Sequence, residues 1–188
     1  VTGDANITGA TNISGTTTID DNLNVTGNAN ISGNTNITGA TNITGATTIK
    51  NNLTVTGNAN ITGNTNITGA TNISGTTKID DNLNVTGDAN ITGTTNISGT
   101  TTIDDNLNVT GNANITGATN ISGATTIKNN LTVTGNANVS GTTTLNKLIV
   151  TGNTNLASVT AATLNVTGQT TLSSTTISGG LTITNGGI

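Results

Sequence analysis

Three pairs of neighbouring aspartates are the residues of this chain most suited to acid–base or metal chemistry. They are Asp20–Asp21, Asp80–Asp81 and Asp104–Asp105. If three chains surrounded one axis, each pair would become a ring of six carboxylates, a set of oxygen ligands that suits calcium or magnesium. Lys50 and Lys128, however, replace the first aspartate in equivalent repeats. A position that accepts either charge is an exposed solubilising position, so we predict no metal site.

The rest of the composition excludes most enzymatic chemistry. The 188 residues include no His, no Cys and no aromatic residue, and the sequence also has no Arg and no Glu. The commonest general base and the usual zinc ligands are therefore missing, and no aspartate pair has the apolar surroundings that a glycosidase acid requires. We predict that the chain is not an enzyme and has no catalytic residue and no cofactor. Without Arg or aromatic rings we expect no nucleic-acid partner. Without a run of 18 apolar residues we expect no membrane insertion.

Glycosylation motifs of the form Asn-x-Thr/Ser occur in almost every repeat, for example at Asn6, Asn24 and Asn60. Two interpretations stay open. We favour the one in which Asn and Thr simply flank a buried aliphatic residue on the outer face of a strand. The alternative is a heavily glycosylated surface filament, because such motifs accept glycans where they are exposed.

Outward threonines at regular spacing are also typical of β-solenoid proteins that bind ice. In this chain the outward threonines alternate with Asn and Ser, and no motif with two ranks of Thr-x-Thr recurs on one face. We therefore consider ice binding a weaker candidate function than a fibre shaft or an extracellular filament.

A six-residue repeat places all of these side chains. Val or Ile begins each of 24 consecutive units from Val1 to Val139, as in VTGDAN, ITGATN and ISGTTT. No helical stripe has a period of six, and Gly, Asn and Thr are poor helix formers. A disordered spacer has no physical reason to keep a β-branched aliphatic residue at every sixth position. Val, Ile and Thr favour strands and regular Gly interrupts them, so the pattern predicts short strands separated by corners.

The third position of the repeat predicts where the chain turns. It is Gly in 19 units and Asp or Asn in the other five, which are IDDNLN at Ile19, Ile79 and Ile103 and IKNNLT at Ile49 and Ile127. An unpaired carboxylate is costly to bury, which argues against an inward position. Gly, Asn and Asp best tolerate a left-handed backbone, so we expect a corner with a positive φ angle there.

Strand alternation then assigns a side to each remaining position. The first and fifth positions, Val/Ile and Ala/Thr/Leu, face inward, and the sixth and second, mostly Asn and Thr/Ser, face outward. Burial of one large aliphatic residue contributes roughly 2–3 kcal/mol per unit, which is less than the cost of ordering six residues. Stability must therefore come from stacking many units through backbone hydrogen bonds.

Two known families resemble this pattern. The aliphatic first position and the small fifth position, over residues 1–144, resemble the hexapeptide repeat of left-handed β-helix acyltransferases, which implies a three-sided coil with three units per turn. The chain departs from that family at the second position, where Thr or Ser replaces Gly or an acidic residue, and it has no His for catalysis. The resemblance therefore implies the coil but not the acyltransferase activity.

The second resemblance is to the shafts of bacteriophage tail fibres and related virion fibres. It rests on the runs LNVTGNAN from Leu23, LTVTGNAN from Leu53 and Leu131, and LNVTGQTT from Leu164. The Val-x-Gly element is similar to the trimeric intertwined β-helix of phage puncturing needles, whose repeat has eight residues. This resemblance implies a homotrimeric fibre on a virion, or elsewhere outside cells, that joins further fibre segments or a receptor-binding tip.

The spacing of the five variant units bears on whether one chain or three form the coil. Successive variant units are 5, 5, 4 and 4 units apart. In a one-chain coil with three units per turn, equivalent units stack only at multiples of three, and these do not. In an intertwined homotrimer all faces are equivalent, so the spacing favours the trimer. Because each turn rises about 4.8 Å, the one-chain coil would be ~50 Å long and the trimer ~150 Å.

The repeat changes toward the C-terminus. The unit that begins at Leu145 is one residue short, and units of eight and nine residues follow from Leu164. We predict a regular shaft over residues 1–144 and an irregular continuation of it over 145–188. The fold class is an all-β, three-sided β-helix of hexapeptide repeats, intertwined as a homotrimer. The predicted function is to space and stiffen a receptor-binding tip, and the alternative is a cell-derived extracellular filament or adhesin stalk, with or without glycans.

Overall fold

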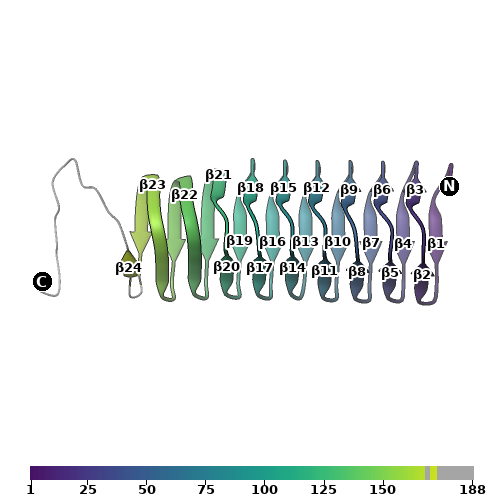
Figure 1. Ribbon diagram of the computed structural model, residues 1–188, viewed down its shortest axis with the longest axis horizontal. Helices are drawn as coiled ribbons and strands as arrows, with labels where there is room; N and C mark the ends of the chain where they lie inside the picture. The colour runs from purple at the N-terminus through teal and green to yellow at the C-terminus, as the bar shows by residue number, and fades with distance from the viewer. Residues whose placement is uncertain (168–169, 173–188) are drawn as a thin grey trace, which may run out of the picture.

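The chain winds into a parallel β-solenoid of about nine turns in the computed structural model (Figure 1). The structure describes residues 1–167 and 170–172, and this part consists of strands and connecting bends, with no helix. Most strands have three residues, taken from the fifth and sixth positions of one unit and the first position of the next. The all-β solenoid predicted from the repeat is confirmed.

The strands stack in three ladders, because each pairs in parallel with the strand 18 residues later. The first ladder consists of β1 (Ala5–Ile7), β4 (Leu23–Val25), β7 (Thr41–Ile43), β10 (Ala59–Ile61), β13 (Thr77–Ile79), β16 (Thr95–Ile97) and β19 (Ala113–Ile115). The second consists of β2 (Thr11–Ile13), β5 (Ala29–Ile31), β8 (Thr47–Ile49), β11 (Thr65–Ile67), β14 (Leu83–Val85), β17 (Thr101–Ile103) and β20 (Thr119–Ile121). The third consists of β3 (Thr17–Ile19), β6 (Thr35–Ile37), β9 (Leu53–Val55), β12 (Thr71–Ile73), β15 (Ala89–Ile91) and β18 (Leu107–Val109).

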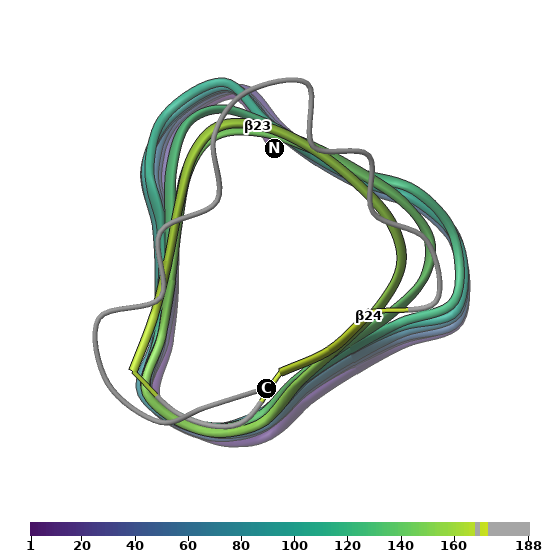
Figure 2. The same cartoon turned by 90° about the vertical axis from the view of Figure 1, so that its left-hand side faces the viewer.

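Longer strands continue the ladders toward the C-terminal end. They are β21 (Thr125–Val133), β22 (Ala137–Val150) and β23 (Thr154–Val166), and the short β24 (Thr170–Leu172) pairs with β23. The turn also shortens: Leu131 pairs with Leu148, 17 residues away, and Val150 pairs with Val166, 16 residues away. The last turns accordingly lie partly inside the outline of the earlier ones when the rod is viewed end-on (Figure 2). The units of eight and nine residues predicted from Leu164 lie largely outside the described residues, and the division at residue 145 stays a prediction.

The core is a thin column that runs the length of the rod. The first-position aliphatic residues are buried from the second turn onward, and so are the fifth-position side chains, as Val55 and Ala29 illustrate. The sixth- and second-position side chains point away from the core and are exposed or half-buried. The predicted assignment of inward and outward positions is therefore confirmed.

The backbone hydrogen bonds of the described ladders join successive turns of one chain. Thr26 donates its N–H to the carbonyl of Ile7 at 2.9 Å, for example, and the same bond recurs along the rod. This pairing corresponds to the one-chain coil. An intertwined trimer would place similar ladders between chains, and that assembly stays a prediction.

The core of a one-chain coil accommodates the spacing of the variant units. Each variant unit carries Leu at the fifth position, and the residues that pair with it in the turns before and after are mostly Ala or Thr. Leu53, for instance, lies between Thr35 and Thr71, and Leu83 between Thr65 and Thr101. In the regular part of the rod no leucine therefore stacks on another in the adjacent turn, whereas toward the C-terminal end Leu131 pairs with Leu148. The offset spacing is thus compatible with a one-chain coil, and the intertwined trimer stays a prediction.

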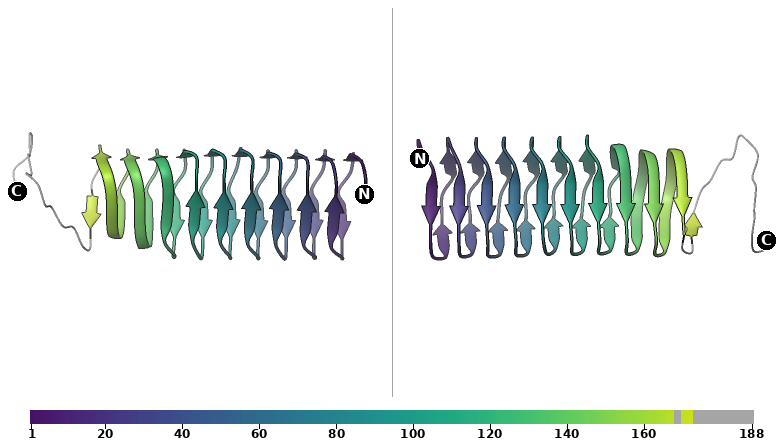
Figure 3. Two further views of the ribbon diagram at one scale, coloured as in Figure 1. Left: turned by 90° about the horizontal axis from the view of Figure 1, so that it is seen from above. Right: turned by 180° about the vertical axis from the view of Figure 1, so that it is seen from behind.

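The corners lie where the third position predicts, but the reason for glycine differs from our expectation. None of the glycines that the structure describes has a left-handed φ. Instead, each corner packs against the corner one turn earlier: a Cβ added at Gly33 would lie 2.4 Å from the carbonyl carbon of Gly15 and 2.5 Å from its oxygen. Figure 3 shows these corners stacked along the rod from two sides. At these corners glycine permits a close approach of two backbones rather than a positive φ, whereas five corners carry Asp or Asn at the same position.

Candidate functional site

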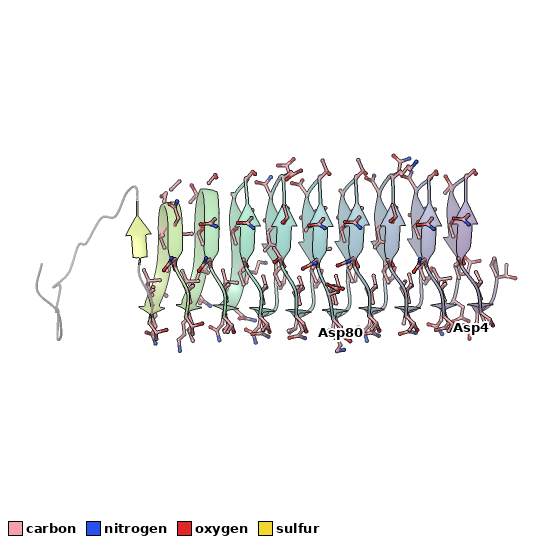
Figure 4. All side chains as sticks on the ribbon, turned by 90° about the horizontal axis from the view of Figure 1, so that it is seen from below. Asp4 and Asp80 are labelled. Atoms are coloured by element: carbon pink, nitrogen blue, oxygen red, sulfur yellow. The ribbon has the colours of Figure 1, made fainter. Side chains whose placement is uncertain are left out.

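The structure does not bring the three aspartate pairs together. Asp20 follows β3 on the third ladder, Asp80 follows β13 on the first, and Asp104 follows β17 on the second, so each lies on a different ladder and in a different turn. The side chains of the three pairs are exposed except for the half-buried Asp81, and Figure 4 shows Asp4 and Asp80 on the outside of the rod. Within the described residues, no group of three or more potential ligands from His, Cys, Asp and Glu is close enough to hold a metal ion. That these positions serve solubility stays a prediction.

Lys78 and Asp80 form an ion pair two residues apart on the first ladder. Their side chains retain 56% and 39% of their exposure, so water and salt screen the attraction. An exposed pair of this kind contributes between zero and about 1 kcal/mol. It positions no further group and has no catalytic geometry.

The sixth-position asparagines form hydrogen-bonded rows along the outside of the rod. On the first ladder Asn24 donates through Nδ2 to Oδ1 of Asn6, Asn42 donates to Asn24, and Asn60 donates to Asn42, at 2.8, 2.8 and 2.9 Å. Similar bonds join Asn72, Asn90 and Asn108 on the third ladder. These rows hold otherwise flexible amides in fixed orientations.

This geometry bears on the glycosylation motifs, because the Nδ2 atom that would carry a glycan is the donor of the amide row. Successive amides are one strand spacing apart, about 4.8 Å, and neighbouring glycans cannot both occupy so little room. The rows therefore support the interpretation that these asparagines serve the outer face of the strands.

Asparagines at the fourth position form a second set of contacts, which the repeat pattern alone does not reveal. They lie at the corners, and their Oδ1 atoms accept the backbone N–H of the fourth-position residue one turn later. Asn82 accepts from Thr100 at 2.6 Å and Asn22 accepts from Ala40 at 2.7 Å. The contact satisfies a backbone donor that lies outside the strand ladders. The signal in the sequence is the frequency of Asn at the fourth position, but its meaning depends on a turn length that the sequence leaves open.

Buried threonine hydroxyls are the unexpected polar feature of the interior. Fourteen inward threonines have a buried Oγ1 with no hydrogen-bond partner in the structure, all at fifth positions or their C-terminal equivalents. A cavity of about 10 Å³ lies beside Thr65, Thr71 and Ala59, in a turn that has no Leu at the fifth position. It is too small for any ligand other than a single water molecule. The interior therefore offers no substrate site among the described residues.

The described residues include no helix that is long and apolar enough to cross a membrane. Comparisons of the chain with protein-family models, with curated proteins and with solved structures gave no match.

Proposed function

We propose that this chain is a structural rod, the shaft segment of a fibre that holds a binding tip away from the particle or cell that carries it. The observation that supports this proposal most directly is the unbroken ladder of backbone hydrogen bonds, most of them 2.7–3.1 Å long, that links each turn to the next. Each turn repeats the same contacts, so length can be extended without changing the cross-section.

A virion fibre, such as a phage tail fibre, is our first choice for its setting. The Leu-x-Val-Thr-Gly runs that resemble such fibres include β4, β9 and strand residues of β21, so the resembling residues form the strands and corners of the rod. The proposed partners are further fibre segments or a tip, and the proposed location is the virion or another extracellular setting. An extracellular filament or adhesin stalk is the second candidate, favoured by the exposed Asn-x-Thr motifs.

We also propose a three-sided cross-section, supported by the three ladders and by the three rounded corners of the end-on view (Figure 2). The one-chain coil accounts for the backbone pairing without a partner. We therefore prefer the one-chain coil to the intertwined homotrimer. The homotrimer would have three times the mass of one chain and form a rod about three times as long.

Resistance to proteolysis tests the rod. Lys50, Lys78 and Lys128 expose their side chains to trypsin, but their backbones lie in or beside the ladders. A protease needs several residues of extended, accessible backbone. Trypsin should therefore leave residues 1–140 uncut under conditions that digest the urea-unfolded chain. Rapid cleavage after these lysines in the absence of urea would contradict a rigid rod.

Contour length separates the assemblies. Electron microscopy of the purified chain should show rods of about 45 Å for one-chain coils of nine turns, given the strand spacing of about 4.8 Å, and sedimentation should give the mass of one chain. Rods about three times as long with the mass of three chains would establish the intertwined trimer instead. Compact particles without an elongated axis would exclude a shaft altogether.

A further inference from the structure

One outer face of the rod carries two parallel ranks of uncharged hydrogen-bonding groups. It lies on the first ladder from β1 to β10, where each of four successive strands presents an Asn and, two residues later, a Thr. We call it the Asn–Thr face, and it consists of Asn6, Thr8, Asn24, Thr26, Asn42, Thr44, Asn60 and Thr62. Its threonines are exposed and its asparagines are exposed or half-buried. No Thr-x-Thr motif recurs on one face of the rod, but the fold aligns Asn-x-Thr into two ranks on the first ladder.

The Asn rank is held in place by its own hydrogen bonds. Asn6, Asn24, Asn42 and Asn60 are joined from amide to amide at 2.8–2.9 Å. Each amide in the middle of the row uses one N–H and one carbonyl position within the row, and its second N–H and second lone pair remain available outward. The face therefore presents fixed donors and acceptors and loses little side-chain entropy on binding.

The charge distribution indicates an uncharged partner. The first charged side chains on this ladder are Lys78 on the next strand, β13, and Asp80 directly after it, and Asp4 lies at the corner before β1 rather than on the strand. On the second ladder, by contrast, Lys50 interrupts the face after two strands and lines an open groove beside Ser14 and Ser32. A phosphate polymer or an anionic surface would find no cation on the Asn–Thr face.

The spacing indicates a partner that is itself a lattice. The ranks repeat about every 4.8 Å along the rod, and the two ranks are separated by roughly 6.7 Å, which is twice the rise per strand residue. Both distances are on the scale of the oxygen repeats of hexagonal ice. A sugar polymer is less suitable, because the chain has no aromatic residue to stack on sugar rings. We propose that the Asn–Thr face binds ice, through water molecules ordered by its amides and hydroxyls.

The test compares Thr44→Lys with Thr86→Lys. Thr44 lies within the Asn–Thr face between Thr26 and Thr62, whereas Thr86 follows β14 on the second ladder, one strand before Asp104. Lysine occurs naturally at the same repeat position in Lys50, so neither substitution should disturb the fold, which circular dichroism would verify. A long charged side chain in the middle of the face should prevent close contact with ice.

The measurements are thermal hysteresis and ice-crystal shape in solutions of the unmodified chain and both variants, together with their partition into a slowly growing ice hemisphere. The proposal predicts faceted crystals and enrichment in ice for the unmodified chain and for Thr86→Lys, and loss of both for Thr44→Lys. Exclusion of the unmodified chain from ice would overturn it, and so would equal enrichment of the two variants. Neither result would affect the proposed shaft, which does not depend on this face.

Discussion

The close packing of corners makes a quantitative prediction at Gly33. A methyl group at this position would lie 2.4 Å from the carbonyl carbon of Gly15 and 2.5 Å from the backbone nitrogen of Thr16. Carbon atoms pack at about 3.5–4.0 Å, so the two corners must separate by roughly 1 Å to admit it. The ladder bonds on both sides of this corner would then stretch. They are the bond from Ser32 N–H to the Ile13 carbonyl and the bond from Thr17 N–H to the Asn34 carbonyl, each 2.8 Å long.

The expected cost follows from these two bonds. A backbone hydrogen bond contributes about 0.5–1.5 kcal/mol net, so weakening both costs about 1–3 kcal/mol. Residual strain adds to this loss, whereas the smaller entropy of the unfolded alanine chain offsets about 0.4–1 kcal/mol. Gly33→Ala should therefore lower the free energy of unfolding by about 2 kcal/mol. Gly15→Ala is the matched control, because it occupies the same corner one turn earlier and nothing lies within 4 Å of its added Cβ. It should be neutral or slightly stabilising.

Urea unfolding followed by far-UV circular dichroism measures the difference. Gly33→Ala should shift the midpoint to lower urea, while Gly15→Ala should leave it unchanged or raise it, with similar slopes for both. Equal midpoints for the two variants would refute the reasoning, because they would mean that the corner at residue 33 does not contact the corner at residue 15. The 18-residue turn would then be wrong.

Three further substitutions probe the interior, the corner amides and the surface charges. Thr65→Val replaces a buried hydroxyl without a partner by a methyl of similar size, and it should stabilise the rod by about 1 kcal/mol in urea unfolding; a loss of stability would show that the hydroxyl is hydrogen-bonded. Asn82→Ala removes the acceptor for the Thr100 N–H, so hydrogen exchange of the Thr100 amide, followed by NMR, should become markedly faster. An unchanged exchange rate would exclude the hydrogen bond between Thr100 N–H and Asn82 Oδ1. Lys78→Ala breaks only an exposed ion pair and should change the thermal stability by less than about 1 kcal/mol at any salt concentration, so a larger effect would assign that pair a structural role.

Much of this fold is predictable because every unit obeys one rule. The period of six with an aliphatic first position indicates strands and corners, and strand alternation correctly places Val55 inside and Asn60 outside. The location of the corner at the third position also follows from its Gly, Asn and Asp residues. Each of these inferences needs only information within one or two units.

The features that cannot be deduced from the sequence depend on which units contact each other in successive turns of the rod. Gly33 is glycine because of a backbone 18 residues earlier, and Asn82 caps a backbone amide 18 residues later. A six-residue period is compatible with one-chain and three-chain coils, so the distance in sequence between touching units cannot be deduced from it. The same ambiguity applies to the offset of Leu53 and Leu83, which fits an intertwined trimer as well as a one-chain coil in which each leucine pairs with smaller residues.

The distance between two spin labels on one ladder tests most directly whether one chain winds the rod. Thr26 and Thr116 are exposed, follow β4 and β19, and are separated by five successive strand pairings. The chain has no cysteine, so Thr26→Cys/Thr116→Cys can be labelled without removing any residue. In samples diluted with unlabelled chain, pulsed electron spin resonance should give a narrow distribution near 24 Å, which is five strand spacings of about 4.8 Å. A distance of roughly 70 Å, as three intertwined chains require, or a broad distribution, as an unordered chain would give, would contradict the one-chain rod.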